Sequence, residues 1–190
     1  LFIVNHGDRV ERILNIRGKE RAMSDNLRVE VESSLVCYLT GDQTANAKIS
    51  ADQAYTRQWW EEEKSACDVY DSKYVIGECA VGRADAVAKR DSILKLLSVI
   101  DADSAKVGEL AQKLIDGHAL PSGEATDALH IASAAISGMD VLLTWNCRHM
   151  ANPHTLPKTI KIIENAGYRC PWIMTPKTFL DNKNMEVSNA

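Results

Sequence analysis

The 190-residue sequence has few aromatic residues, no long hydrophobic run and no large excess of charge of one sign. No uncharged segment approaches the roughly 18 residues that a membrane-spanning helix needs, and no apolar stretch near the N-terminus resembles a signal peptide. The five cysteines are an odd number without Cys-x-x-Cys spacing, which argues against a disulfide framework and a zinc ribbon. We therefore expect a cytoplasmic protein with no membrane partner.

The charged residues exclude nucleic-acid binding through bulk electrostatics. Lysine and arginine number 22 and aspartate and glutamate 26, so the formal net charge is −4, and no Lys/Arg-rich block or basic tail is present. If the substrate is a nucleic acid, a local positive charge must offset the carboxylates. A bound divalent cation would supply that charge.

The N-terminal residues differ in composition from the rest of the chain. Residues 1–22 carry five basic and three acidic residues, a net charge of +2, and the first methionine in a plausible starting position is Met23. We expect residues 1–26 to be an extension, disordered or preceding the natural start of translation, residues 27–181 to form one domain and residues 182–190 to form a tail. The alternative for the extension is a basic arm that contacts a partner.

Segments with strand-like patterns alternate with segments of helical periodicity. Strands are expected at residues 27–31, 67–71, 96–100, 140–145 and 172–174. Helices are expected at residues 33–40, 50–66, 72–82, 85–94, 103–115, 125–137 and 156–165. Because hairpin turns are lacking, the alternation predicts an α/β fold with a central parallel sheet of about four or five strands flanked by helices.

Polar residues stand where an α/β sheet binds ligands, outside the carboxyl ends of its strands. Glu32 closes the first predicted strand, and Asn146 closes the strand at 140–145. Glu78 and Asp127 lie on helices among small or apolar residues, where an unpaired carboxylate is costly. A shared hard cation stabilises several carboxylates together. Taken singly, each acid also has a structural interpretation, as a helix-terminal charge or a satisfied buried acid.

Four segments together carry a resemblance to a known family. They are Val-Glu-Val-Glu-Ser-Ser at 29–34, the short helix around Glu78, Thr-Asp-Ala-Leu-His-Ile-Ala at 126–132 and Thr-Trp-Asn-Cys-Arg-His at 144–149. This pattern resembles the PIN-domain nucleases, and most of all the VapC-type toxins of type II toxin–antitoxin systems, over about residues 28–179. The second pair of motifs is specific when both are present.

The resemblance implies a PIN-like fold and a divalent-metal-dependent ribonuclease. At the matching positions, Glu32, Glu78 and Asp127 would bind Mg²⁺ or Mn²⁺, and Asn146 would complete the catalytic set. Glu32 is one methylene longer than the aspartate usual in the family, and Asn146 carries no charge. The expected cluster therefore holds three carboxylates, which suits one tightly bound ion that activates water for attack on the phosphodiester.

The resemblance also assigns supporting residues and partners. Ser34 and Thr144 match small hydroxyl residues that hold the fourth side chain and a nearby water. Arg148 and His149 follow the last catalytic position and are candidates for phosphate contacts, with an unliganded surface pair as the alternative. The family further suggests an RNA substrate, a homodimer and a cognate antitoxin protein.

Other functions fit some of the same residues. One is a non-catalytic PIN-fold module that binds RNA or a protein partner, and another is a nuclease specific for DNA or for a nucleic-acid structure. The glycine spacing at 77–84 resembles a P-loop but lacks its lysine and hydroxyl residue. A zinc site from Cys147, His149 and His154 has an uncommon spacing and no evident fourth ligand.

Overall fold

The computed structural model describes residues 26–188, so the predicted N-terminal extension falls almost wholly outside the described residues. The strands are β1 (Leu27–Val31), β2 (Cys67–Asp71), β3 (Ser98–Val99), β4 (Val141–Leu143) and β5 (Trp172–Met174). The helices are α2 (Ser33–Thr40), α3 (Ala47–Glu62), η1 (Lys64–Ala66, 3-10), α4 (Lys73–Cys79), α5 (Ala84–Leu94), α6 (Ser104–Asp116), α7 (Ala125–Ile136), α8 (Leu156–Asn165) and α9 (Pro176–Ser188).

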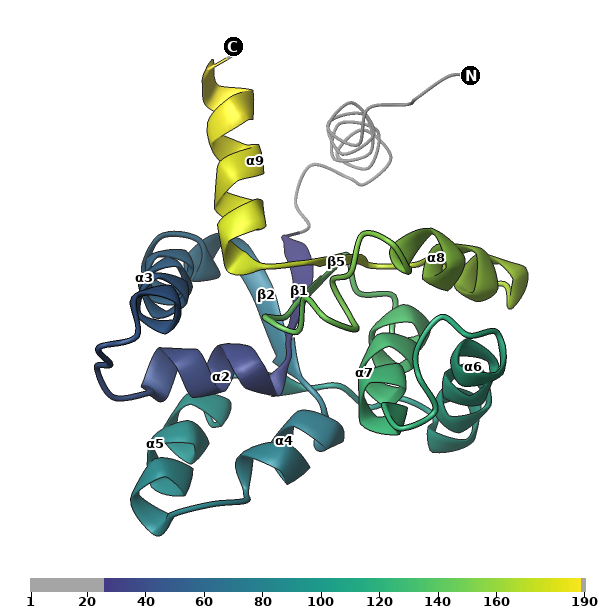
Figure 1. Ribbon diagram of the computed structural model, residues 1–190, viewed down its shortest axis with the longest axis horizontal. Coiled ribbons are helices and arrows are strands. Elements are labelled where there is room, and N and C mark those ends of the chain that lie inside the picture. The colour runs from purple at the N-terminus through teal and green to yellow at the C-terminus, as the bar shows by residue number, and fades with distance from the viewer. Residues whose placement is uncertain (1–25, 189–190) are drawn as a thin grey trace.

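The five described strands form one parallel sheet in the order β3-β2-β1-β4-β5. Helices α2, α3, α4 and α5 lie on one side of it and α6, α7 and α8 on the other (Figure 1). The predicted α/β class with a parallel sheet flanked by helices is therefore confirmed, and this architecture is consistent with a PIN-like fold. No helix among the described residues is long and apolar enough to cross a membrane.

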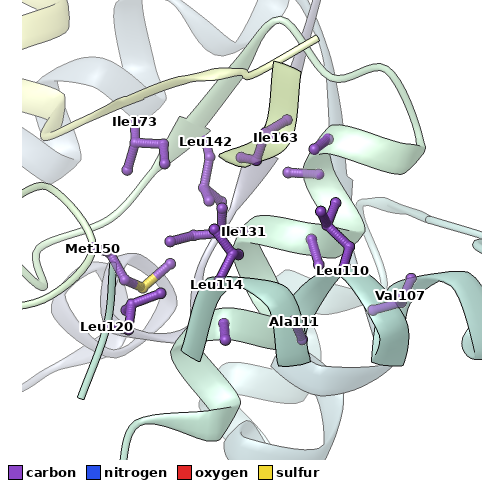
Figure 2. Close-up of a cluster of buried hydrophobic side chains, with 14 of the residues drawn as sticks. Val107, Leu110, Ala111, Leu114, Leu120, Ile131, Leu142, Met150, Ile163 and Ile173 are labelled. Carbon is purple, nitrogen blue, oxygen red and sulfur yellow. The ribbon is translucent and has the colours of Figure 1, made fainter. Parts of the chain in front are cut away.

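Each face of the sheet is covered by its own hydrophobic core, because alternate side chains of a strand point to opposite faces. Figure 2 shows the first core, in which Leu110 and Leu114 of α6 and Ile131 of α7 pack with Leu142 of β4. The second core joins Val29 and other strand residues to the buried sides of α2, α3, α4 and α9. A central strand such as β1 therefore has no face open to solvent.

Several predicted elements differ in their bounds from the structure, among them the first long helix and the strand at 96–100. Helix α3 begins at Ala47 rather than at residue 50, because the Asn46 side chain accepts hydrogen bonds from the next turn and caps the helix there. The buried strand predicted at 96–100 is wrong. The first residues of this apolar run form a turn after α5. Only the exposed pair Ser98–Val99 joins the sheet, at its edge.

The C-terminal helix extends past the predicted end of the domain at residue 181. Helix α9 continues to Ser188, Leu180 is buried in the second core, and Lys183 donates to the Glu63 carboxylate after α3. The first residues of the predicted tail therefore continue a helix that contacts the domain.

The order of the strands determines where a ligand site can form. From β1 the chain adds β2 and β3 on one side and β4 and β5 on the other, so the topological switch point lies between β1 and β4. Ligands of open α/β sheets bind outside the carboxyl ends of the strands at such a point. The backbone nitrogen of Glu32 donates to Leu143 O at 2.9 Å, which joins the two strand ends there.

Candidate metal centre

Glu32 is fixed where β1 passes into α2, as the N-cap of that helix. Its carboxylate accepts four hydrogen bonds, from the Ser33 and Ser34 hydroxyls, from Ser34 N at 3.1 Å and from Thr144 Oγ1 at 2.9 Å. The residue is 6% exposed. Four donors replace the water that the buried carboxylate loses, so the side chain is held in one orientation at the edge of the sheet.

Ser34 and Thr144 have a more direct role than the resemblance implies. Both hydroxyls donate to Glu32, and they also accept from the backbone that follows β4, Ser34 Oγ from Trp145 N and Thr144 Oγ1 from Asn146 N, each at 2.9 Å. They therefore connect Glu32 to the chain segment that carries Asn146 rather than holding the Asn146 side chain itself.

Glu78 lies in the last turn of α4 and forms an ion pair with His130 of α7. Glu78 Oε2 is 3.1 Å from His130 Nε2, and the imidazole is 0% exposed whereas the Glu78 side chain is 39% exposed. The hydrogen bond from His130 lowers the pKa of Glu78 against an opposing effect of burial. Burial also opposes protonation of His130, but the Glu78 hydrogen bond and nearby carboxylates outweigh it and raise the pKa of the imidazole.

Asp127 lies in the first turn of α7 and is tied to the loop after β4. Its Oδ2 accepts from Asn146 Nδ2 at 2.8 Å and is 3.3 Å from His149 Nδ1, which also lies 3.3 Å from Glu124 Oε2. The backbone nitrogen of His149 donates in turn to Asn146 Oδ1. Burial, then the charges of Glu124 and Glu32, raise the pKa of Asp127. Its carboxylate is therefore a stronger proton acceptor than an ordinary aspartate.

The three predicted metal ligands fall into two groups rather than one. Potential ligand atoms of Glu32, Glu78 and His130 lie within 4.8 Å of one another, as do those of Glu124, Asp127 and His149, and the described residues contain no set that holds all three predicted carboxylates at this spacing. The two groups are neighbours, because the charges of Glu32 and His130 both act on Asp127. A single ion enclosed by the three acids would require them to move closer together.

The predicted phosphate-contacting pair is divided. The His149 side chain is 15% exposed and faces Asp127 and Glu124, so it belongs to the second group of potential ligands. Arg148 is exposed on the turn beside it. The exposed Arg148 therefore stays a candidate for phosphate contacts, whereas His149 faces the acids.

Sequence analysis did not identify Glu124 or His130 as potential metal ligands. Glu124 precedes Asp127 by three residues, the spacing that places two side chains on one face of a helix, and this spacing was a usable signal. His130 has the same spacing after Asp127. It is packed and hydrogen-bonded within the core, as expected for a histidine on an alanine-rich helix, but its partner is Glu78.

Two further acids, Glu30 and Asp71, are buried and belong to neither group of potential metal ligands. Glu30 and Asp71 are both 0% exposed, and neither carboxylate has a hydrogen-bond partner among the described residues. Burial raises the pKa of Glu30 to about 8, with opposing effects of His130 and of Ser72. Burial raises the pKa of Asp71 to about 6. Glu30 is therefore largely protonated at neutral pH, whereas Asp71, with its lower pKa, is largely ionised.

The donor sets fit a divalent cation. Carboxylate oxygens suit Mg²⁺ and Mn²⁺, and an imidazole nitrogen favours Mn²⁺ over Mg²⁺. Each group offers two carboxylates and one histidine. Because His130 already binds Glu78, it can also act behind the ligand and fix the orientation of that carboxylate.

The comparisons with known proteins add no relative. No family model matches the chain, and no curated protein matches its sequence. An assignment of function therefore depends on the fold, the motifs and the geometry of these side chains.

Proposed function

We propose that this chain is a divalent-metal-dependent endoribonuclease of the PIN type that hydrolyses RNA phosphodiester bonds with Mg²⁺ or Mn²⁺. The supporting observation is the convergence of Glu32, Asp127 and Asn146 at the switch point of a parallel sheet, with two carboxylate–histidine groups side by side. The motifs that carry the family resemblance all contribute to this one place. RNA is proposed as the substrate because of that resemblance.

In the proposed reaction, some of these residues bind the cation and others act on the attacking water. Glu32 and Glu78 would hold the cation, and His130 positions Glu78. A bound divalent cation would supply positive charge that offsets the carboxylates and stabilises charge on the phosphoryl oxygens. Asp127, with its raised pKa, is the group to take a proton from the attacking water, and Asn146 holds its Oδ2.

The substrate must bring its phosphate to the acids at the edge of the sheet. Unstacked nucleotides in loops or single strands reach such a site more readily than a duplex does. Arg148 is exposed, directly precedes His149 in the chain and would contact a neighbouring phosphate. A cytoplasmic location, a homodimer and an antitoxin that covers the acidic groups belong to the same proposal.

Incubation of the purified protein with total RNA tests the proposal. We expect cleavage with Mg²⁺ or Mn²⁺, loss of cleavage with EDTA and recovery when the metal is restored. Asp127→Asn keeps the shape of the side chain and should abolish cleavage, whereas Glu164→Gln, on α8, serves as a charge-matched control. Cleavage that persists in EDTA, or in Asp127→Asn at the wild-type rate, would refute the proposal.

The main alternative is a PIN-fold module that binds RNA or a protein without cutting. One observation favours it: protein groups pair with the carboxylates of Glu32, Glu78 and Asp127 through hydrogen bonds or an ion pair. Calorimetric titration with Mn²⁺ separates the two functions. The nuclease should bind the ion and cleave, and the module should do neither. A single-stranded DNA substrate in the same assay tests the DNA-nuclease alternative.

A further inference from the structure

Two aromatic side chains meet beside the candidate metal centre. Tyr38 lies on α2, and Trp145 is the second residue after β4. Their ring centroids are 5.8 Å apart at an interplanar angle of 71°, which is an edge-to-face contact. Both residues are partly exposed, and neither belongs to the two hydrophobic cores of the described residues. Packing of the core therefore does not account for this pair.

Trp145 is held in place at two points. Its backbone nitrogen donates to Ser34 Oγ at 2.9 Å, and its indole Nε1 donates to Thr56 Oγ1 at 2.8 Å. Thr56 is 0% exposed, and its hydroxyl donates in turn to Asp52 O at 2.7 Å within α3. The indole therefore keeps one orientation. A ligand that stacks on a fixed ring loses less conformational entropy than one that must first order the ring.

Trp145 is connected to the acids of both groups of potential ligands. Ser34 Oγ, which accepts from Trp145 N, donates to the Glu32 carboxylate, so two hydrogen bonds link Trp145 to the first group. The next residue, Asn146, donates to Asp127 Oδ2 at 2.8 Å in the second group. A phosphate bound by these acids would therefore have the aromatic pair beside it.

The charges near the pair favour an uncharged ligand at the rings and a phosphate next to them. Burial and then the negative charge of Asp52 raise the pKa of Tyr38, so Asp52 is close enough to repel an anion from the phenol. Arg148, which is exposed three residues after Trp145, supplies positive charge for a phosphate. Nucleobases meet both conditions, because they are neutral, carry flat faces that stack on aromatic rings and are joined through phosphates.

We propose that Tyr38 and Trp145 form a stacking surface that binds one unpaired base of single-stranded RNA next to the phosphate at the metal centre. An edge-to-face contact covers one face of only one ring, so the pair itself leaves ring surface for a base. A base in a duplex stays stacked on its neighbours and cannot use this surface. The inference rests on the proposed function for its choice of RNA, but it concerns binding, which is measured apart from cleavage.

Fluorescence anisotropy measures the binding of a labelled single-stranded RNA, about eight nucleotides long, to the full-length protein. Ca²⁺ replaces Mg²⁺ in this assay, and gel electrophoresis verifies that the RNA stays intact. Tyr38→Leu should weaken binding about tenfold, because it removes the stacking face and keeps an apolar side chain. Tyr38→Phe keeps the ring and should bind within about twofold of the wild-type protein.

The same substitution at a tyrosine far from the acids is the matched control. Tyr168 is also partly exposed, but it precedes β5 and therefore lies at the amino edge of the sheet, whereas the acids lie at the carboxyl edge. Tyr168→Leu should leave RNA binding unchanged. Equal weakening by Tyr38→Leu and Tyr168→Leu, or weakening by neither, would overturn the proposal.

Changes in the RNA test the stacking itself. An abasic nucleotide, moved position by position along the strand, should at one position weaken binding to the wild-type protein about tenfold. At that position it should weaken binding to Tyr38→Leu by less than about twofold, because the stacking contact is already lost. The RNA annealed to its complement should bind about tenfold more weakly than the single strand. Fully additive losses, or equal binding of the duplex, would overturn the proposal.

Cleavage with Mg²⁺ separates this inference from the proposed function. In an active enzyme, Tyr38→Leu should raise KM about tenfold and leave kcat within about twofold, since the base stacks equally in the ground state and the transition state. Binding that depends on Tyr38 without any cleavage would support the stacking surface and refute the nuclease. Cleavage with binding and KM both unaffected by Tyr38→Leu would overturn the stacking surface and leave the nuclease in place.

Discussion

Glu30 and Glu32 are two glutamates of the same short segment, and their surroundings are opposite. Glu32 is 6% exposed and accepts four hydrogen bonds at the end of β1. Glu30 is 0% exposed inside β1, and its carboxyl oxygens have no hydrogen-bond partner among the described residues. Burying a carboxylate is costly unless donors replace the lost water, and otherwise the group takes up a proton. Position along one strand thus separates a potential metal ligand from a neutral core residue.

The end of a strand differs from its middle because of what surrounds it. At the end of β1, the first turn of α2 supplies unpaired N–H groups and serine hydroxyls, and the end of β4 supplies Thr144. Inside β1 the backbone groups already pair with neighbouring strands, so they offer no free donors to the Glu30 carboxyl group. The contrast predicts different consequences for the same substitution at the two positions.

The largest expected difference concerns RNA cleavage. Glu32→Gln removes the charge from the proposed metal site and should reduce metal-dependent cleavage at least about a thousandfold, since the cation supplies much of the transition-state stabilisation. Glu30→Gln is the matched control and should cleave at close to the wild-type rate. Single-turnover assays on one RNA measure both. Equal losses in the two variants would break the distinction between them.

A second difference concerns stability as a function of pH. The folded-state pKa of Glu30 is about 8, against 4.5 for the free group, so the folded protein binds more protons and stability is lost as pH rises through about 8. Between pH 5 and pH 9 this loss should amount to about 4 kcal/mol from Glu30. The free energy of unfolding, measured by urea denaturation between pH 5 and pH 9, should fall less in Glu30→Gln than in the wild-type protein. The exposed Glu109→Gln should match wild type, and a wild-type slope in Glu30→Gln would contradict the prediction.

A third test removes one of the donors that distinguish Glu32. Thr144→Val preserves the shape of the side chain but removes one of the two hydrogen bonds to Glu32 Oε2 and the acceptor of Asn146 N. The free energy of unfolding should fall by about 2 kcal/mol, measured by urea denaturation. Thr159→Val, at another buried threonine, loses only a long 3.3 Å contact within its helix and should cost less than about 0.5 kcal/mol. Equal costs would show that the Glu32 contact contributes nothing specific.

The smallest effect is expected at the edge of the second group. Glu124 belongs to the second group of potential ligands, whereas the proposed cation is held by Glu32 and Glu78 of the first group, so the Glu124 charge acts on the ion from farther away. Glu124→Gln should weaken Mn²⁺ binding about threefold, compared with tenfold or more for Glu78→Gln beside Glu32. Calorimetric titration of both variants measures the ratio. A stronger effect of Glu124→Gln would assign the ion to the second group instead.

Helix and strand positions could be predicted where the pattern was strong. The alanine-rich α7 was found at nearly its observed limits, and β4 was located within the longer strand predicted at 140–145, because both elements are buried along most of their length. The apolar run at 96–100 was misassigned, since a short apolar segment does not reveal whether a partner strand covers it, and here only two residues pair with β2. The helix after residue 176 was missed because its pattern is weakly amphipathic.

The residues of the site could be predicted better than which of these residues lie close to one another. Glu32, Asp127 and Asn146 could be recognised because strand ends and the first turn of a helix are local features. Whether Glu78 faces Asp127 or His130 depends on how α4 packs against α7, and the sequence does not contain that distance. The burial of Glu30 was hidden for the same reason, since alternation along β1 indicates a strand but not whether its second face is covered.

The sequence by itself determined a parallel α/β sheet and the carboxylate, amide and hydroxyl groups at its carboxyl edge, because hydrophobic periodicity and the alternation of strands with helices can be read along the chain. Only the tertiary structure decided which carboxylates hydrogen bonds stabilise, which are kept neutral by burial, and how the potential ligands divide into two groups. The physical reason is that the charge and coordination of an acid depend on groups distant in the sequence, within a few ångströms of its oxygens.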